Sequence, residues 1–364
     1  MIGSNLSSTE FIMQIAALLS AAGLSPNVLS IKNCTQGKNN RTYRIHTVDG
    51  PFVIKQYLRQ EGDTRDRLAA EFAFLSYAKA VAPRQVPQPF FQDLKQSMAL
   101  YEFMEGRPLQ PEEVTTAEVD QAAEFFCALN EPQTRAHAAT LPVASEACFS
   151  LQEHLALISA RIALLQKITP EADAALRGRG NLDAVEDQAA KRLIQRLSDY
   201  WQKLAAALKT VADNEGLDLT ACLDPSQRCI SPSDFGFHNA LKMPDGSLCF
   251  LDFEYAGWDD PAKMTGDFFS QLALPVPENQ FNGFVAQVMQ SFARSEELIR
   301  RAQLLRRVYR VKWCCIALNI FLPVHLARYR FANPSLKVAD FKRKQLDKVT
   351  HLIQALETQD YGLH

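Results

Sequence analysis

The segment from Cys229 to Phe269 constrains the fold of this chain more than any other stretch. Asp234 is followed five residues later by Asn239, and strand-like runs then flank the residues 244–246, Pro-Asp-Gly. That composition is typical of a turn, so the pattern predicts a β-hairpin. Asp252 stands where the second apolar run of this hairpin ends. One rigid support is therefore expected to carry two carboxylates and an amide.

These three side chains suit a definite kind of chemistry. A loop that carries Asp234 can present a carboxylate to a substrate hydroxyl group. Asn239 and Asp252 offer the hard oxygen ligands that magnesium prefers. A carboxylate at the end of a buried strand is costly without a partner, so a cation is a natural explanation for Asp252.

The segment resembles the catalytic and metal-binding loops of the aminoglycoside phosphotransferase and choline kinase family, small-molecule kinases with a protein-kinase-like fold. The resemblance implies that Asp234 is the catalytic base and that Asn239 and Asp252 hold the magnesium ion that bridges the ATP phosphates. The residues 258–261, Trp-Asp-Asp-Pro, followed by Gly266-Asp267, resemble the next motif of that family.

The sequence departs from the family pattern at two positions. Pro232 stands two residues before the base, where family members usually carry His, and Asp259 replaces the Gly of the Gly-Asp-Pro turn. Neither change removes a metal ligand, but the support of the loop must differ. His238, beside Asn239, is interpreted as a packed or hydrogen-bonded histidine rather than a catalyst.

Length and composition are those of an ordinary folded protein with about two domains or lobes. A net charge of −2 over 364 residues gives no reason to expect a nucleic-acid partner. The N-terminal residues lack the basic run and apolar core of a secretory signal, and the longest apolar run, 314–327, is too short to span a bilayer. We therefore expect a cytoplasmic protein that does not bind membranes. The eight cysteines follow neither a zinc nor a disulfide pattern.

The N-terminal part of the chain predicts one helix followed by an antiparallel meander. Helical periodicity runs from Thr9 to Ala22. Strand signals follow at residues 28–32, 42–47 and 52–57. Gly37 and Asn40 lie between the first two strands, where they can form a phosphate-binding loop or a plain hairpin loop. The spacing Gly-x-x-Asn-x-x-Tyr-x-Ile resembles the nucleotide loop of the same family.

Lys55 and Glu71 are the predicted ion pair of the nucleotide site. Lys55 lies in the third strand, where a cation suits the α- and β-phosphates if an acid holds it in place. Glu71 lies among apolar neighbours in the following helix, where an unpaired carboxylate is unfavourable. The resemblance implies that the two side chains pair; two ordinary surface charges are the alternative.

The run 100–109 leaves a predicted strand and breaks at Gly106. It resembles the hinge between the lobes of a kinase. The resemblance implies that adenine bonds to backbone groups of Glu102 and Met104, with Tyr101 at the back of the pocket. The lobe boundary is therefore expected near Glu105.

The rest of the chain is mostly helical in pattern. Periodicity predicts helices at 115–130, 150–167 and 183–213, a loop at 131–147, and further helices after Asp267. The segment 294–348 holds 14 Lys or Arg against four Asp or Glu. Such a bias is usual for a solvated helix face. It also disfavours a polycationic acceptor, so we expect a neutral or anionic one.

These features predict an α+β, bilobal protein-kinase-like fold. Residues 1–105 form a small antiparallel-sheet N-lobe that binds the nucleotide, and residues 106–364 form a large, mainly helical C-lobe with the catalytic loop, the metal site and the acceptor region. The implied reaction is ATP- and Mg²⁺-dependent phosphorylation of a hydroxyl group on a small metabolite, such as a sugar or an amino alcohol. A nucleotide-binding pseudokinase that regulates a partner protein is the alternative, motivated by Pro232. Protein-kinase activity is a third option, which the hinge and turn motifs disfavour.

Overall fold

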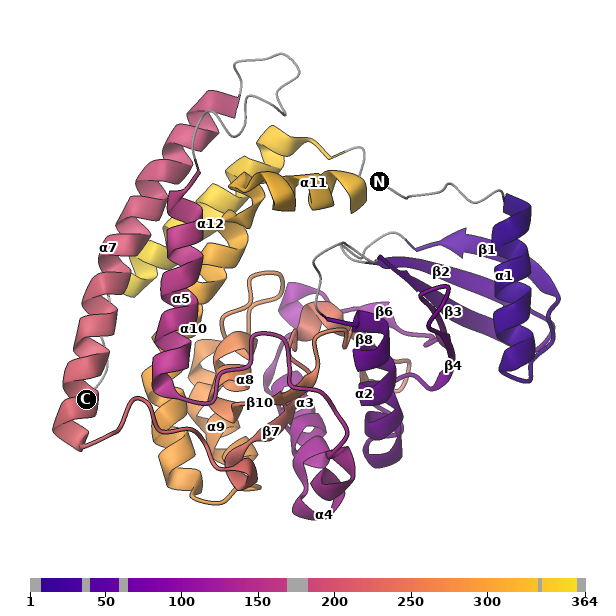
Figure 1. Ribbon diagram of the computed structural model, residues 1–364, viewed down its shortest axis with the longest axis horizontal. Coiled ribbons are helices and arrows are strands. Elements are labelled where there is room, and N and C mark those ends of the chain that lie inside the picture. The colour runs from indigo at the N-terminus through magenta and orange to yellow at the C-terminus, as the bar shows by residue number, and fades with distance from the viewer. Residues whose placement is uncertain (1–7, 35–39, 59–64, 169–182, 333–335, 359–364) are drawn as a thin grey trace.

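The computed structural model describes residues 8–34, 40–58, 65–168, 183–332 and 336–358. A small lobe is built on a five-stranded antiparallel sheet, and a large lobe is built mainly of helices (Figure 1). This is the α+β, bilobal arrangement that the sequence predicts.

The sheet of the small lobe has the strand order β1-β2-β3-β5-β4. Its strands are β1 (Val28–Asn33), β2 (Asn40–Thr47), β3 (Gly50–Tyr57), β4 (Pro89–Asp93) and β5 (Met98–Glu102). Helix α1 (Ser8–Ala21) covers one face of the sheet. Ile15, Leu18 and Leu19 from one side of α1 form a small core with apolar residues of β2, β3 and β5.

Helix α2 (Arg67–Val81) packs on the opposite face and lies beside the large lobe (Figure 1). Side chains alternate along a strand, so β5 serves both faces: Met98 and Leu100 join the core under α1, whereas Ala99 and Tyr101 join the core that contains α2. Asp66 caps α2 by accepting a hydrogen bond from the Ala69 N–H group. The core that contains α2 continues without a break into the large lobe.

Two small antiparallel sheets position the loops of the large lobe. The first contains β6 (Arg107–Pro108), β8 (Ala240–Lys242) and β9 (Leu248–Phe250), and its last two strands form the predicted hairpin. The second pairs β7 (Cys229–Ser231) with β10 (Gly257–Asp259). Residues 232–239 and 251–256 connect these strands, so both connections are held at each end by strand pairing.

Helices make up most of the large lobe. They are α3 (Thr116–Asn130), α4 (Pro132–Arg135), α5 (Leu151–Gln166), α7 (Asp183–Glu215), α8 (Pro261–Phe268), α9 (Phe281–Met289), α10 (Ser295–Leu318), α11 (Pro323–Ala332) and α12 (Val338–Thr358). Short 3₁₀ turns are η1 (Pro111–Glu113), η2 (Ala136–Ala138), η3 (Pro225–Gln227), η4 (Phe237–Asn239), η5 (Glu278–Gln280) and η6 (Asn319–Phe321).

The expectation of a plain loop at 131–147 is wrong, because α4 and η2 lie there. Pro132 supplies the fixed φ angle of a first helical residue, and elements this short carry no apolar periodicity. In the described ranges, no single helix has both the length and the apolar character to cross a membrane. One helix pair meets both conditions jointly, Ser295–Phe321 with Pro323–Arg330, and it is bent by 74°.

Candidate active site

Lys55 joins the two lobes at the centre of the candidate site. It lies on β3, and its Nζ atom is 2.6 Å from Glu71 Oε1 on α2 and 3.0 Å from Asp252 Oδ1, which follows β9. Burial alone would lower the pKa of Lys55, but the Asp252 and Glu71 carboxylates outweigh burial and raise it. The lysine therefore stays cationic, as a group that binds phosphate must.

Glu71 is almost fully buried, and both of its carboxylate oxygens accept hydrogen bonds. Besides Lys55, it accepts hydrogen bonds from the Tyr57 hydroxyl group (2.5 Å) and from the Phe253 N–H group (3.3 Å). The Tyr57 hydroxyl lies 2.9 Å from that of Tyr101, and burial raises the pKa of both tyrosines. Tyr57 was missed by the sequence reasoning. Its position two residues after Lys55, on the same face of the strand, was the available signal.

Asp252 leaves the hairpin through a left-handed backbone turn with φ of 66°. That conformation is uncommon for a residue other than glycine and marks a tightly determined position. The preceding residue, Leu251, donates its N–H to the Asn239 carbonyl oxygen at 2.8 Å. The Asp252 side chain keeps 35% of its surface exposed. The carboxylate thus reaches solvent from a fixed backbone.

Asn239 and Asp234 are held together within the connection from β7 to β8. The Asn239 amide nitrogen donates to the main-chain oxygen of Asp234 at 2.9 Å. With its nitrogen used in this way, the amide presents its oxygen as the atom for a cation. The Asp234 side chain is 36% exposed. Asp234 and Asn239 are thus hydrogen-bonded to each other and, through the Leu251 N–H, to the residue before Asp252, which contacts Lys55.

The donor set at this position fits magnesium. Asp252 supplies a carboxylate and Asn239 an amide oxygen, both hard ligands. In the part of the chain that the structure describes, no three His, Cys, Asp or Glu side chains gather as a metal cluster. A site with few protein ligands suits magnesium, which usually keeps waters and takes further ligands from substrate phosphates.

The predicted nucleotide loop is described only at its end. Gly37 lies outside the described residues. Asn40 begins β2 and is buried, and its Nδ2 atom lies 3.4 Å from Glu254 Oε2. Glu254 is itself buried, two residues after Asp252. The sequence reasoning passed over Glu254, although an acid so close to a metal-binding candidate was a usable signal.

A family model described as the phosphotransferase enzyme family matches residues 30–300 of the chain. The chain belongs to this family. The match confirms the predicted enzyme class, a phosphotransferase. Among curated proteins, no sequence matches the chain.

Solved structures share the fold of this phosphotransferase along nearly its whole length. A choline/ethanolamine kinase family protein from Mesorhizobium loti is 17% identical, with a TM-score of 0.57 and 96% of each chain covered. A Plasmodium vivax ethanolamine kinase is 14% identical, with a TM-score of 0.58, 97% of this chain and 92% of its own covered. A spectinomycin phosphotransferase in complex with ADP and spectinomycin is 10% identical, with a TM-score of 0.60, 96% and 100% covered. At these identities the likeness shows the fold, and it confirms the predicted fold class.

The loop that carries Asp234, the predicted base, has its own hydrogen bonds around Pro232. The Ser231 hydroxyl accepts a hydrogen bond from the Ser233 N–H group at 3.0 Å. His238 lies on the other side of the loop, with Nε2 3.4 Å from Asp234 Oδ1. A Cβ atom at Gly236 would lie 2.8 Å from His238 Nδ1, so a larger residue there would have to displace the histidine ring. The histidine interpreted as a packed residue thus packs against the predicted base.

At the hinge, the main chain is only partly available to adenine. The Glu102 N–H group already donates to the Gln88 carbonyl oxygen at 2.9 Å, and the Glu102 carboxylate accepts from Lys79 (3.1 Å) and from the Gln88 N–H. If adenine binds at this predicted hinge, its main-chain donor would have to come from another residue of the segment, such as the half-buried Met104.

The Asp-Asp-Pro turn of this phosphotransferase, residues 259–261, holds three helices of the large lobe together. Asp260 accepts hydrogen bonds from the Ala262 N–H (2.7 Å), His154 Nε2 (2.9 Å) and Arg301 Nε (2.6 Å). Although burial alone would raise the pKa of Asp260, Arg301 and His154 bring it well below the ordinary value. The turn thereby ties the start of α8 to α5 and α10.

Asp259, which replaces the family's glycine, has a dedicated partner. Its Oδ2 atom lies 2.5 Å from Lys263 Nζ, and both side chains are almost fully buried. Because β10 pairs with β7, the Asp259 position is also bonded to the strand that leads into the catalytic loop. The added acid is therefore neutralised inside the lobe and does not enter the site.

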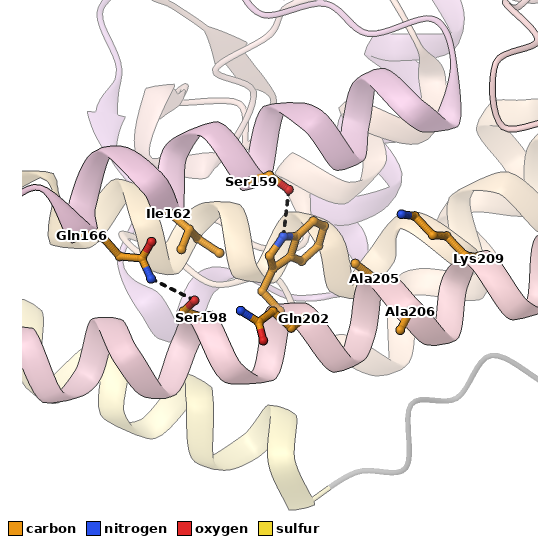
Figure 2. A pocket seen from close by; sticks show the side chains of 9 residues that line it. Ser159, Ile162, Gln166, Ser198, Gln202, Ala205, Ala206 and Lys209 are labelled. Carbon is orange, nitrogen blue, oxygen red and sulfur yellow. Dashed lines mark hydrogen bonds between the residues drawn. The ribbon is translucent and has the colours of Figure 1, made fainter.

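The surface groove of about 410 Å³ between α5 and α7 lies apart from this site. Its lining mixes polar and apolar side chains (Figure 2), and Gln166 donates a hydrogen bond to Ser198 there. Trp201, which also lines the groove, donates to Ser159. None of the predicted catalytic, nucleotide or metal residues lines it. The side chains suited to phosphoryl transfer lie around Lys55, so the groove is not the candidate active site.

Proposed function

We propose that this phosphotransferase transfers the γ-phosphoryl group of ATP, with Mg²⁺, to a hydroxyl group on a small metabolite. The observation that supports it best is the set of contacts around Lys55, which joins Glu71 of the small lobe to Asp252 of the large lobe. Spectinomycin phosphotransferase was solved with ADP, and ethanolamine kinase and the choline/ethanolamine kinase family protein are named for small alcohols. These relatives support a nucleotide and a small hydroxyl acceptor for this chain.

We assign each side chain a part in this reaction. Lys55, oriented by Glu71, binds phosphate oxygens, and the small lobe holds adenine between the hinge and Tyr101, with Gly37 and Asn40 near the phosphates. Asn239 and Asp252 hold Mg²⁺, which when bound neutralises phosphate charge. Asp234 accepts the proton of the acceptor hydroxyl. Because phosphoryl transfer has a loose transition state, positioning and charge outweigh proton removal.

The proposed acceptor is neutral or anionic. The basic residues of 294–348 motivated this expectation, and several of them bind acids elsewhere in the fold. Such pairs are Arg300–Glu215, Arg301–Asp260, Arg306–Glu278, Lys312–Asp267, Lys342–Asp187 and Arg343–Glu186. Much of the basic excess thus stabilises the large lobe, so a test must offer cationic acceptors alongside neutral and anionic ones.

The experiment is a screen for ADP release with ATP, Mg²⁺ and a panel of amino alcohols, sugars and antibiotic alcohols. With an active acceptor, Asp234→Asn is expected to lower kcat by about 10²–10⁴-fold, the usual contribution of a general base. Binding of a non-hydrolysable ATP analogue is expected to stay unchanged. Asp245→Asn, in the exposed turn of the same hairpin, is the matched control and keeps full activity.

Two results would contradict this proposal, the first at the kinase assignment and the second at the role of Asp234. Nucleotide binding without transfer to any acceptor would favour the pseudokinase alternative. An Asp234→Asn variant with the full rate would show that Asp234 is not the base.

A further inference from the structure

Arg65 immediately precedes α2 and reaches from the small lobe to the main chain of the large lobe. Its guanidinium donates to three carbonyl oxygens: Nε to Glu254 at 3.0 Å, Nη2 to Ala256 at 2.8 Å, and Nη1 to Val143 at 2.9 Å. A guanidinium has a rigid array of donors, so three simultaneous bonds fix its orientation. None of the three acceptors is a side chain, so this contact depends on the path of the backbone.

The acceptors belong to two segments that are bonded to each other. The Trp258 N–H donates to the Pro142 carbonyl, and the Ala144 N–H donates to the Trp258 carbonyl, both at 2.9 Å. Gly257, the residue before Trp258, has φ of 156°, and a Cβ atom there would lie 2.1 Å from the Pro142 oxygen. Only glycine permits this approach. Arg65 therefore binds two segments, residues 142–144 and 254–258, that are hydrogen-bonded to each other, rather than one isolated loop.

The second of these two segments begins two residues after Asp252. Arg65 bonds to a carbonyl two residues beyond Asp252, and Glu71 lies six residues beyond Arg65 on the rigid helix α2. Both acids that contact Lys55 are thus tied to one arginine. If α2 moved away from the segment 252–256, Lys55 could not keep both contacts.

We propose that Arg65 is a positioning residue for the phosphate-binding centre: it locks α2 onto the segment that follows Asp252, so that Lys55 meets Glu71 and Asp252 together. The inference rests on the proposed function in that Lys55 and Asp252 are taken to bind the nucleotide. It adds a residue outside that centre, which acts through the relative position of the lobes.

The test is calorimetric binding of a non-hydrolysable ATP analogue with Mg²⁺ to the full chain. Arg65→Ala is expected to weaken binding by about 10- to 100-fold, the usual effect of losing a residue that orients a metal or phosphate site. Arg65→Lys, which can reach one carbonyl at a time, is expected to bind the analogue with an affinity between those of the wild type and of Arg65→Ala. The matched control is Arg228→Ala, because Arg228 bonds the Leu223 carbonyl and stacks on Phe149 within one lobe. It is expected to bind as wild type does.

A double-mutant cycle distinguishes positioning from general stabilisation. If Arg65 acts through Glu71, then Arg65→Ala adds little once Glu71→Gln is present, whereas independent effects would multiply. Multiplying effects, wild-type affinity of Arg65→Ala, or an equal loss in Arg228→Ala would each overturn the proposal. If the wild-type chain itself bound no nucleotide, the proposed function would fail first, so the two failures are distinguishable.

Discussion

Lys55 and Lys263 each contact two carboxylates, and the difference between their surroundings separates the proposed phosphate-binding centre from a structural support. Lys55 joins residues that are 16 and 197 positions away along the chain. Its partners come from α2 and from the segment after β9, so the cluster spans both lobes. Asp252 remains 35% exposed and can exchange one partner for another.

The cluster around Lys263 is local and closed. Its acids, Asp259 and Asp267, are each four residues away, with Nζ–Oδ2 distances of 2.5 and 3.7 Å. All three side chains are at most 5% exposed. Asp267 also accepts hydrogen bonds from Lys312 and from the Trp313 ring N–H at 2.8–3.0 Å. Nothing in this cluster has an open side at which a substrate could bind.

Exposure and sequence separation, rather than residue type, thus distinguish the proposed phosphate-binding cluster around Lys55 from the cluster around Lys263. Both clusters contain the same charges. A closed cluster loses stability when one partner is removed, because the other charge stays buried and unpaired. An open cluster across two lobes should lose activity instead, since water can solvate what remains.

The largest effect is expected for Asp252→Ala. The substitution removes a partner of Lys55 and a proposed metal ligand together, so turnover should fall by more than about 10³-fold and Mg²⁺-ATP binding should weaken. Steady-state kinetics and calorimetry measure both. The unfolding midpoint should stay near that of wild type. A fully active Asp252→Ala variant would disprove the metal assignment.

Asp267→Asn should show the opposite behaviour. Loss of this buried carboxylate leaves Lys263 and Lys312 with fewer partners, and breaking a buried pair costs about 3–5 kcal/mol. Urea unfolding should report a lower free energy of unfolding, while the protein that remains folded keeps its nucleotide affinity. Unchanged stability would remove the distinction between the two clusters.

The smallest expected effect concerns pH. Burial lowers the pKa of His154 below its ordinary value, against the opposing influence of Asp260. His154 therefore binds a proton near pH 6.5 in the unfolded chain but not in the folded chain. The free energy of unfolding consequently decreases as pH falls below that value. The loss approaches about 1.4 kcal/mol per pH unit. His154→Gln, which keeps a donor for Asp260 and an acceptor for Tyr309, should show a shallower decline between pH 7 and 5 in unfolding titrations. An identical slope would contradict the role given to His154.

The sequence predicted those parts of the site that have a local signature. The five-residue step from Asp234 to Asn239 and the hairpin before Asp252 follow from turn chemistry and strand alternation. The placement of Lys55 on a strand and Glu71 on the next helix followed from order along the chain. Lys55, Glu71 and Asp252 contact one another through Lys55, and Asn239 links Asp234 to the residue before Asp252 through hydrogen bonds that involve the main chain, while the chemical roles of all five remain predictions.

The parts that the sequence could not reveal depend on distant contacts. Arg65 binds main-chain oxygens, which leave no residue preference behind. Glu254 and Tyr57 had signals in their spacing from Asp252 and Lys55, but their partners Asn40 and Glu71 come from other elements of the fold. The basic segment 294–348 has the pattern of a solvated face, yet its partners, such as Glu215 and Asp187, come from α7.

The apolar interior of this molecule is divided through the small-lobe sheet rather than at the hinge. The core under α1 is separate, whereas the core on the α2 side is continuous with that of the large lobe. The layer formed by α1 is thus expected to melt as its own cooperative unit on heating, while α2 and the contacts between Lys55 and its two acids survive until the main transition. Calorimetry would then record a shoulder below the principal peak, and shortening α1 would abolish that shoulder alone.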